Sequence, residues 1–296
     1  MKLFGGIETG GTKFVCMVAE GPKNILAEIE FPTTTPEETI DQALVFFQTQ
    51  MKHYHLEGLG IGTFGPVDLD LSSSTYGTIT TTPKPGWANF NLIQCFIDEL
   101  KLPVIIDTDV NAAAQGEFMW GNAIGLDPSI YYTIGTGIGM GGMLNQSLMH
   151  GLTHPEGGHM IIKRDPTRDP FPGACTYHKD CFEGLASGLS LLMRWGQRGE
   201  VLPDDHPAWK LEANYIAQAM VNTILMLSPR KIVLGGGVMK RRQLFPMIHT
   251  EVTRMLKGYV KSPMICDDIE NFIVPAKLGS KAGVLGAIGL AVKAFG

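Results

Sequence analysis

Two glycine-rich corners of similar design constrain the fold of this chain more than any other feature of its sequence. Residues 3–8 and 13–19 are apolar, aromatic or β-branched runs separated by TGGT at 9–12, a pattern that predicts a β-hairpin. Residues 129–144 repeat the arrangement around GTGIG at 135–139. Because both halves begin alike, we expect two duplicated α/β lobes with a cleft between them.

The rest of the chain alternates predicted strands and helices, which is typical of α/β proteins. Thr35 as an N-cap, followed by Pro36 and by Glu38 at the third position, predicts the start of a helix. Hydrophobic periodicity adds strands at 59–63, 104–107 and 231–234 and helices at 110–118, 183–195, 209–227, 244–256 and 281–294. A length of 296 residues favours two domains. We place an N-terminal lobe at 1–121 and a C-terminal lobe at 122–296, whose last helix can pack back on the first.

Composition excludes several classes of function. The formal charge is −5, which argues against non-specific attraction to nucleic acid or to an anionic membrane. The opening residues have no long apolar segment, and nowhere do about 20 apolar residues follow one another, so we expect a cytoplasmic protein. Cys16, Cys95 and Cys266 are isolated in sequence and are interpreted as reduced thiols that pack in the core.

One group of residues has the ligand types of a metal site. Cys175, His178 and Cys181 form a C-x2-H-x2-C run, and His159 precedes it on a proline-rich stretch. Two thiols and two imidazoles are a ligand set for a closed, structural tetrahedral zinc site. Zinc there would pin the irregular residues 155–174, and it would draw together two carboxylates, Glu156 and Glu183. The alternatives are four unrelated residues and two solvated carboxylates.

The glycine corners suggest phosphate binding. Gly10, Gly11, Thr12 and Lys13 offer backbone N–H groups, a hydroxyl and an ammonium, although an ordinary tight turn would need the same glycines. GIGMGG at 137–142 fits a dinucleotide fingerprint, but the residues that follow it lack helical periodicity, which argues against a dehydrogenase. We interpret it as a second phosphate-facing hairpin. Three more glycines follow the strand at 231–234, namely Gly235, Gly236 and Gly237.

Asp109 is the candidate catalytic group. It follows the strand at 104–107 and precedes the next helix, and the carboxyl ends of strands in open α/β sheets face ligands. There a carboxylate could accept a proton from a substrate hydroxyl, the role that phosphoryl transfer asks of an aspartate. The alternative is that Asp107 or Asp109 only caps that helix.

These motifs together resemble the ROK family of sugar kinases over the whole length of the chain. The similarity is strongest to its bacterial fructokinase branch, through the run at 175–188 and PKPGW at 83–87. Three departures from the wider family stand out: Glu8 replaces a usual aspartate, and Asp107 and Thr108 replace a glutamate-asparagine pair. In the metal-ligand run His178 replaces one of three cysteines and the first cysteine is shifted, which fits the fructokinase branch and not the glucokinase one. The family motifs are carried by ETGGTK at 8–13, TDVN at 108–111, GTGIG at 135–139 and EGGH at 156–159.

The resemblance implies an actin-like, ribonuclease-H-type fold and an ATP-dependent hexose kinase, with Asp109 as general base, fructose as acceptor and fructose 6-phosphate as product. It also implies Mg²⁺ carried with ATP, a structural zinc ion held by His159, Cys175, His178 and Cys181, and a homodimer. The implied hexose contacts are Asn89, Asp109, Glu156, His159 and Glu183. The implied nucleotide contacts are Gly10, Gly11, Thr12, Lys13, Thr133, Gly135, Thr136, Gly137, Gly235, Gly236 and Gly237.

Other functions stay open at this point. A kinase of the same family for mannose, glucose or N-acetylmannosamine would share these motifs, and a non-catalytic sugar sensor could keep Glu156 and Glu183. A zinc-stabilised nucleic-acid module is disfavoured because the metal-ligand run lacks a basic recognition helix. Trp195 and Trp209 could lie in a dimer interface as readily as in the core.

Overall fold

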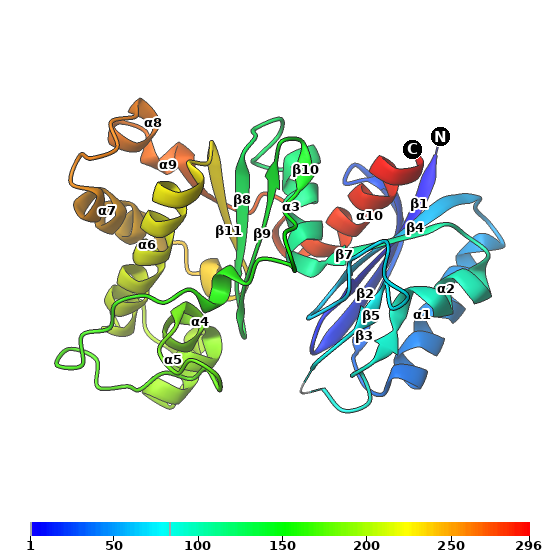
Figure 1. Cartoon of the computed structure of the whole chain (residues 1–296), viewed down its shortest axis with the longest axis horizontal. Helices are drawn as coiled ribbons and strands as arrows, with labels where there is room; N and C mark the ends of the chain where they lie inside the picture. The colour runs from blue at the N-terminus through cyan, green and yellow to red at the C-terminus, as the bar shows by residue number, and fades with distance from the viewer. Residues whose placement is uncertain (1, 83) are drawn as a thin grey trace. The chain divides into compact units, whose positions relative to one another are not determined.

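The computed structural model describes residues 2–82 and 84–296, so Met1 and Pro83, the first residue of the PKPGW motif, lie outside the described residues. The chain forms two compact units (Figure 1). The first comprises Met1–Ile124, Ser147–Pro155 and Ser280–Gly296, and the second comprises Gly125–Gln146 and Glu156–Gly279. The predicted division at residue 121 puts 147–155 in the second lobe, whereas the structure groups them with the first unit. The C-terminal helix packs back on the first unit, as expected for the last helix. The packing of both segments against the first sheet and helix α3 assigns them to the first unit.

The first unit is built on a mixed five-stranded sheet in the order β3-β2-β1-β4-β7. The hairpin strands β1 and β2 are antiparallel, whereas β4 and β7 run parallel to β1. Thr9, Thr63 and Thr108 end the three parallel strands in register, so these strands finish at one edge of the sheet. The strands are β1 (Leu3–Thr9), β2 (Lys13–Gly21), β3 (Asn24–Pro32), β4 (Leu56–Thr63) and β7 (Val104–Thr108).

Helices cover the sheet of the first unit on both faces. A Cβ at Gly5 would lie 2.9 Å from the ring of Phe47 on α1 (Pro36–Met51), whereas one at Gly6 would meet Ile288 on α10 (Ala282–Phe295). Neighbouring residues of a strand point to opposite faces, so these two helices lie on opposite sides. Helix α2 (Leu92–Leu100) contacts α1, and α3 (Asp109–Trp120) packs along α10. A small pair, β5 (Thr78–Ile79) and β6 (Phe90–Asn91), completes the unit.

The second sheet repeats the strand order of the first, as β10-β9-β8-β11-β12. Its first pair, β8 and β9, is antiparallel, and β11 runs parallel to both β8 and β12. The predicted duplicated α/β architecture is therefore confirmed. The strands are β8 (Ser129–Ile134), β9 (Ile138–Leu144), β10 (Ser147–Leu148), β11 (Lys231–Gly235) and β12 (Ile273–Pro275).

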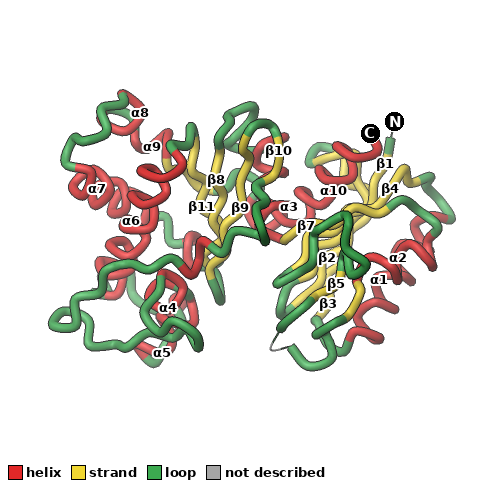
Figure 2. The backbone as a smooth tube through the Cα atoms, in the orientation of Figure 1, coloured by secondary structure: helices red, strands yellow, loops and turns green. Residues whose placement is uncertain are grey.

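The helices of the second unit surround a long irregular segment. Figure 2 shows the chain between the short 3-10 turn Gly157–His159 and α4 as loop, as predicted for residues 155–174. The helices are α4 (Phe182–Ala186), α5 (Gly188–Trp195), α6 (Ala208–Leu227), α7 (Leu244–Leu256), α8 (Pro263–Cys266) and α9 (Ile269–Phe272).

The helix predicted at 183–195 is interrupted in the structure. Residues 183–195 form two helices, because Ser187 adopts an extended conformation between them (ψ 164°) and its Oγ accepts a hydrogen bond from the Ser190 N–H at 3.1 Å. Ser187 is thus an N-cap inside the predicted helix. Trp209 is buried in the second unit and donates from Nε1 to the Pro203 carbonyl at 2.7 Å, which excludes it as an interface residue.

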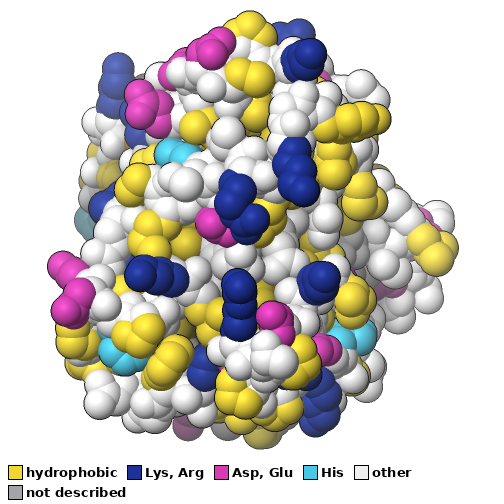
Figure 3. Space-filling view, turned by 90° about the vertical axis from the view of Figure 1, so that its left-hand side faces the viewer, with side chains coloured by type: hydrophobic (Ala, Val, Ile, Leu, Met, Phe, Trp, Pro, Cys, Tyr) yellow, Lys and Arg dark blue, Asp and Glu magenta, His cyan; other side chains and the backbone are white. Residues whose placement is uncertain are grey.

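The surface carries charges of both signs. Figure 3 shows Lys and Arg side chains spread over one face, with acidic and apolar side chains between them. Among the described residues, no helix is both long enough and apolar enough to span a bilayer.

Candidate functional site

The first glycine corner and Asp109 both follow strands that end at the carboxyl edge of the first sheet. Thr9 Oγ1 donates to Thr63 Oγ1 at 2.7 Å, and the Phe64 N–H donates to the Thr9 carbonyl at 3.1 Å. Strand β7 continues this edge and ends at Thr108, one residue before Asp109. Two of the sequence-predicted groups, the corner and Asp109, therefore share one sheet edge.

The glycine corner itself is a tight, exposed turn. The Gly10 N–H donates to the Lys13 carbonyl at 2.9 Å, while Gly11 and Thr12 are exposed. Lys13 Nζ pairs with Glu30 at 2.5 Å, so its ammonium has a carboxylate partner on β3. Sequence reasoning missed Lys84, whose Nζ donates to the Gly11 carbonyl. Its position between two prolines was the only signal available, and it gives no indication of contact with a turn 73 residues away.

Asp109 is the first residue of α3 and is partly exposed. The N-cap of this helix is Thr108, whose Oγ1 accepts from the Asn111 N–H at 3.2 Å. The alternative that Asp107 or Asp109 caps α3 is therefore wrong. Asp109 Oδ1 accepts from the Val110 N–H at 2.9 Å, and the positive end of the helix dipole favours its ionised form. A carboxylate held in this way can act as a base.

Glu8, near the end of β1, lies against the start of α10. A Cβ at Gly283 would come within 2.3 Å of the Glu8 carboxyl carbon, so a larger residue there would displace the Glu8 carboxyl group. Burial, followed by the negative charge of Asp109, raises the pKa of Glu8 to about 7. The two carboxyl groups thus interact electrostatically within the first unit.

Asn89, predicted to contact the hexose, lies in the turn before β6. It is exposed and has a left-handed φ of 61°, and its N–H donates to the Ile79 carbonyl at 2.7 Å. The adjacent Trp87 is fully buried and donates from Nε1 to the Thr34 carbonyl at 3.0 Å. The buried indole holds this turn and leaves the Asn89 side chain accessible.

In the second unit the two remaining glycine segments lie side by side. A Cβ at Gly135 would lie 3.8 Å from the backbone nitrogen of Gly237, and Gly235 pairs in register with Thr133. Gly236 has a φ of 89°, and a Cβ there would lie 2.4 Å from the Ile134 carbonyl oxygen. The sequence-predicted nucleotide residues of this unit are therefore neighbours.

Glu183 is tied to this glycine corner. Its Oε2 accepts a hydrogen bond from the Ile138 N–H at 2.9 Å, and a Cβ at Gly137 would come within 2.7 Å of the same oxygen. The corner is held from the other side by the Gly188 N–H, which donates to the Gly135 carbonyl at 2.7 Å. Glu183 thus has a structural contact in addition to its predicted one with a hexose.

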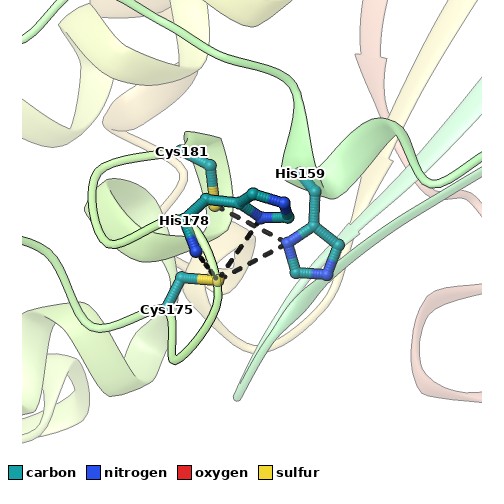
Figure 4. A group of neighbouring side chains, drawn as sticks. All are labelled: His159, Cys175, His178 and Cys181. Atoms are coloured by element: carbon teal, nitrogen blue, oxygen red, sulfur yellow. Dashed lines mark hydrogen bonds between the residues drawn. The ribbon is translucent and has the colours of Figure 1, made fainter.

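The four predicted metal ligands converge, as Figure 4 shows. Their ligand atoms all lie within 4.8 Å of one another. His159 Nδ1 lies 3.7 Å from Cys175 Sγ and 3.6 Å from Cys181 Sγ, and His178 Nδ1 lies 3.8 Å from Cys175 Sγ. Burial raises the pKa of the Cys181 thiol to about 11, so a bound cation would have to displace its proton. These residues form a possible Cys/His metal site.

The metal-ligand loop carries one predicted hexose contact and leads directly into another. Glu156 is exposed, and its carbonyl accepts from the His159 N–H at 2.9 Å, which closes the 3-10 turn. Gly158 packs this turn on β9, because a Cβ there would lie 1.9 Å from the Ile138 carbonyl oxygen. Glu183 lies in the first turn of α4, two residues after Cys181. The four predicted metal ligands therefore include a residue three positions after Glu156 and one two positions before Glu183.

Known proteins match the chain over almost its full length. The model of the ROK family matches residues 4–294. Fructokinases from Pediococcus pentosaceus and Streptococcus mutans are 43% and 41% identical, with 99% of this chain and 98% or more of each relative covered. The solved ROK family glucokinase from Streptomyces griseus, in complex with glucose and AMPPNP, has a TM-score of 0.78 at 25% identity and covers 98% of this chain and 99% of its own. The predicted actin-like α/β fold is confirmed, and the chain belongs to the ROK family.

Proposed function

We propose that this chain is an ATP-dependent fructokinase that transfers the γ-phosphoryl group of ATP to the C6 hydroxyl of fructose. The observation that carries the proposal is Asp109, a partly exposed carboxylate at the end of β7 on the same sheet edge as the first glycine corner. Family membership and two fructokinase relatives above 40% identity support the reaction and the acceptor.

Asp109 would accept the proton of the fructose hydroxyl as its oxygen attacks the γ-phosphorus, and ADP would leave with the cleaved bond. Thr108 caps the α3 N-terminus, and the Val110 N–H holds one carboxylate oxygen of Asp109 in place. A base held in place by a helix cap is already oriented before substrate arrives.

Backbone N–H groups are the main protein contribution to the nucleotide site in this proposal. Gly11 and Thr12 in the first unit and Thr136 in the second are exposed, and each would offer its backbone N–H to a phosphate oxygen. Lys13 would exchange Glu30 for a phosphate oxygen. Mg²⁺ bound with ATP would offset the phosphate charge. The full set comprises Gly10, Gly11, Thr12, Lys13, Thr133, Gly135, Thr136, Gly137, Gly235, Gly236 and Gly237.

We assign the hexose to Asn89, Asp109, Glu156, His159 and Glu183. Asn89 and Glu156 are exposed, so the Asn89 amide can donate to or accept from a sugar hydroxyl and the Glu156 carboxylate can accept from one. His159 would bind metal through Nδ1, which lies nearest both thiols, and would leave Nε2 for a hydroxyl. Glu183 has a second carboxylate oxygen besides the one that accepts from Ile138.

We propose zinc as the ion of the Cys/His cluster, in a structural role. Zinc binds sulfur at about 2.3 Å and imidazole nitrogen at about 2.0 to 2.1 Å, so a tetrahedral site requires sulfur–nitrogen separations of about 3.5 Å. The separations here are 3.6 to 3.8 Å. Four protein ligands leave no open position for a substrate, so the ion would hold the loop that carries Glu156.

A coupled ADP-release assay with MgATP and a panel of hexoses tests the proposal. Turnover should be highest with fructose, and Asp109→Ala should lower kcat roughly 10²- to 10⁴-fold, the range for loss of a general base. Preference for mannose, glucose or N-acetylmannosamine would reject fructose as the substrate. No turnover with any hexose would favour the sugar sensor instead. The cytoplasmic location and the homodimer stay predictions.

A further inference from the structure

Two histidines outside the predicted site contact the two residues that precede Asp109 in the first unit. His150 and His154 lie on the segment Ser147–Pro155, which begins with β10. His150 Nε2 lies 2.9 Å from Asp107 Oδ2, and His154 Nδ1 lies 3.5 Å from Thr108 Oγ1. Neither histidine was assigned a role from sequence.

Asp107 is the centre of this network. Its carboxylate is buried, with 7% of the side chain exposed, and a buried carboxylate requires hydrogen-bond donors. Oδ1 accepts from the Thr108 N–H at 2.8 Å and from Asn111 Nδ2 at 2.9 Å, and Oδ2 accepts from His150. The hydrogen bond to Asp107 raises the pKa of His150, which favours its charged, doubly donating form. His150 is therefore the donor that satisfies the second oxygen.

Asn111 connects the same network to the first turn of α3. Besides Asp107, its Nδ2 donates to the Met149 carbonyl at 3.2 Å. The end of β7, the first turn of α3 and the segment that contains His150 are thus joined through two side chains. Asp109 lies between Asp107 and Asn111 in the chain, so fixing both neighbours fixes the direction in which its side chain leaves the backbone.

We propose that His150 is a positioning residue that holds Asp109 in its reactive orientation through Asp107 and Asn111. The inference rests on the proposed function, because it assumes that Asp109 is the base. His150 acts through hydrogen bonds alone and takes no proton from the sugar. Small displacements of a reacting group reduce the rate steeply, so a loose Asp109 lowers kcat while the binding groups stay in place.

The test compares His150→Ala, His150→Gln and the control His55→Ala, a histidine that is exposed in the same unit. His150→Ala should lower kcat roughly 10-fold to 100-fold, with KM for fructose and for MgATP changed less than about twofold. His150→Gln should restore most of kcat, because a glutamine amide can donate to Asp107. His55→Ala should match the wild type. An unchanged kcat in His150→Ala, or a loss confined to the KM for fructose, would overturn the proposal.

Hydrogen exchange separates this proposal from the proposed function. In the free protein, amides of residues 105–114 should exchange faster in His150→Ala than in the wild type or in His55→Ala, since the anchor of the α3 start is gone. Wild-type inactivity on every hexose would reject the kinase, while faster exchange would still support the anchor. Unchanged exchange at 105–114 would overturn the anchor whatever the activity.

Discussion

At the scale of single residues, the carboxyl edge of the first sheet contains a carboxyl group, that of Glu8, whose pKa is raised by its surroundings. Glu8 is one methylene longer than the aspartate usual in the ROK family. Its carboxyl group occupies the space that a Cβ at Gly283 would need. Burial and the charge of Asp109 favour its protonated form, although Lys13 and the Val284 N–H favour the ionised one. Burial prevails, and the pKa of Glu8 rises to about 7.

Glu8 should make stability fall as the pH rises from about 4.5 to about 7. Below the lower value both the folded and unfolded chains hold the proton, whereas between the two values only the folded chain does. Ionisation therefore favours the unfolded chain until the pH passes about 7. With about 1.4 kcal/mol for each pH unit, this lowers the free energy of unfolding by at most about 3 kcal/mol. Urea unfolding at a series of pH values measures the effect.

The matched variants for this measurement are Glu8→Gln and Glu20→Gln. The stability difference between Glu8→Gln and the wild type should shift in favour of the variant between pH 4.5 and pH 7 and then stay constant. Glu20 is exposed on β2 and should give a difference that is flat with pH. A flat difference for Glu8→Gln as well would contradict the raised pKa.

At the scale of elements, local signals predicted the helices and strands whose boundaries are set by neighbouring residues. Thr35 caps α1 as its sequence indicated, with its Oγ1 accepting from the Glu38 N–H at 3.3 Å. Strand β3, at the sheet edge, was missed although Ala27, Ile29 and Phe31 alternate with two glutamates, the pattern typical of an edge strand. The break at Ser187 was missed because an N-cap serine is also tolerated within a helix.

The site was predictable to the extent that its residues are close in sequence. The C-x2-H-x2-C spacing and the glycine corners are local patterns, and the structure brings the metal ligands together. Lys84 beside Gly11 and His150 beside Asp107 are contacts over 73 and 43 residues. No periodicity or motif records such contacts, because they are created only when separate elements pack.

Removing the metal should weaken hexose binding more than it slows catalysis. The cluster anchors the loop next to Glu156 and the start of α4 with Glu183, while Asp109 belongs to the other unit. A zinc chelator should raise the KM for fructose roughly 10-fold, lower kcat much less, and reduce the melting temperature. Added zinc should reverse all three effects, and elemental analysis should find one zinc ion per chain before treatment.

Cys175→Ser should raise the KM for fructose and lower the melting temperature as the chelator does, with no chelator added. Cys266→Ser is the control, because Cys266 lies outside the cluster and its thiol is exposed, so the prediction that it packs in the core is wrong. A protein that contains no zinc as purified, or a Cys175→Ser variant with the wild-type KM and melting temperature, would contradict the structural metal.

At the scale of the whole molecule, the first unit is discontinuous in sequence and includes residues on both sides of the second unit. Helix α10 follows the entire second unit, yet it packs on the first sheet and along α3. A Cβ at Gly60 would lie 1.9 Å from the Ala287 carbonyl oxygen, and one at Gly286 would lie 1.8 Å from the Ala112 carbonyl oxygen. Backbone therefore meets backbone on both sides of this helix, a fit that needs glycine on each surface.

Removal of residues 280–296 should therefore prevent the first unit from folding. The deletion exposes the sheet face that α10 covers and removes fully buried side chains such as Val284 and Ile288. Burial of each such side chain contributes about 1.5 to 3 kcal/mol, whereas the total free energy of unfolding of a protein is typically about 5 to 15 kcal/mol. Circular dichroism and urea unfolding of the 1–279 chain should show lost structure and no cooperative transition for this unit. In the full chain, Ile288→Ala should cost about 2 to 5 kcal/mol, whereas Val45→Ala, 62% exposed on α1, should cost little. Cooperative unfolding of the 1–279 chain at the wild-type midpoint would show that α10 is dispensable and would contradict its role in closing the unit.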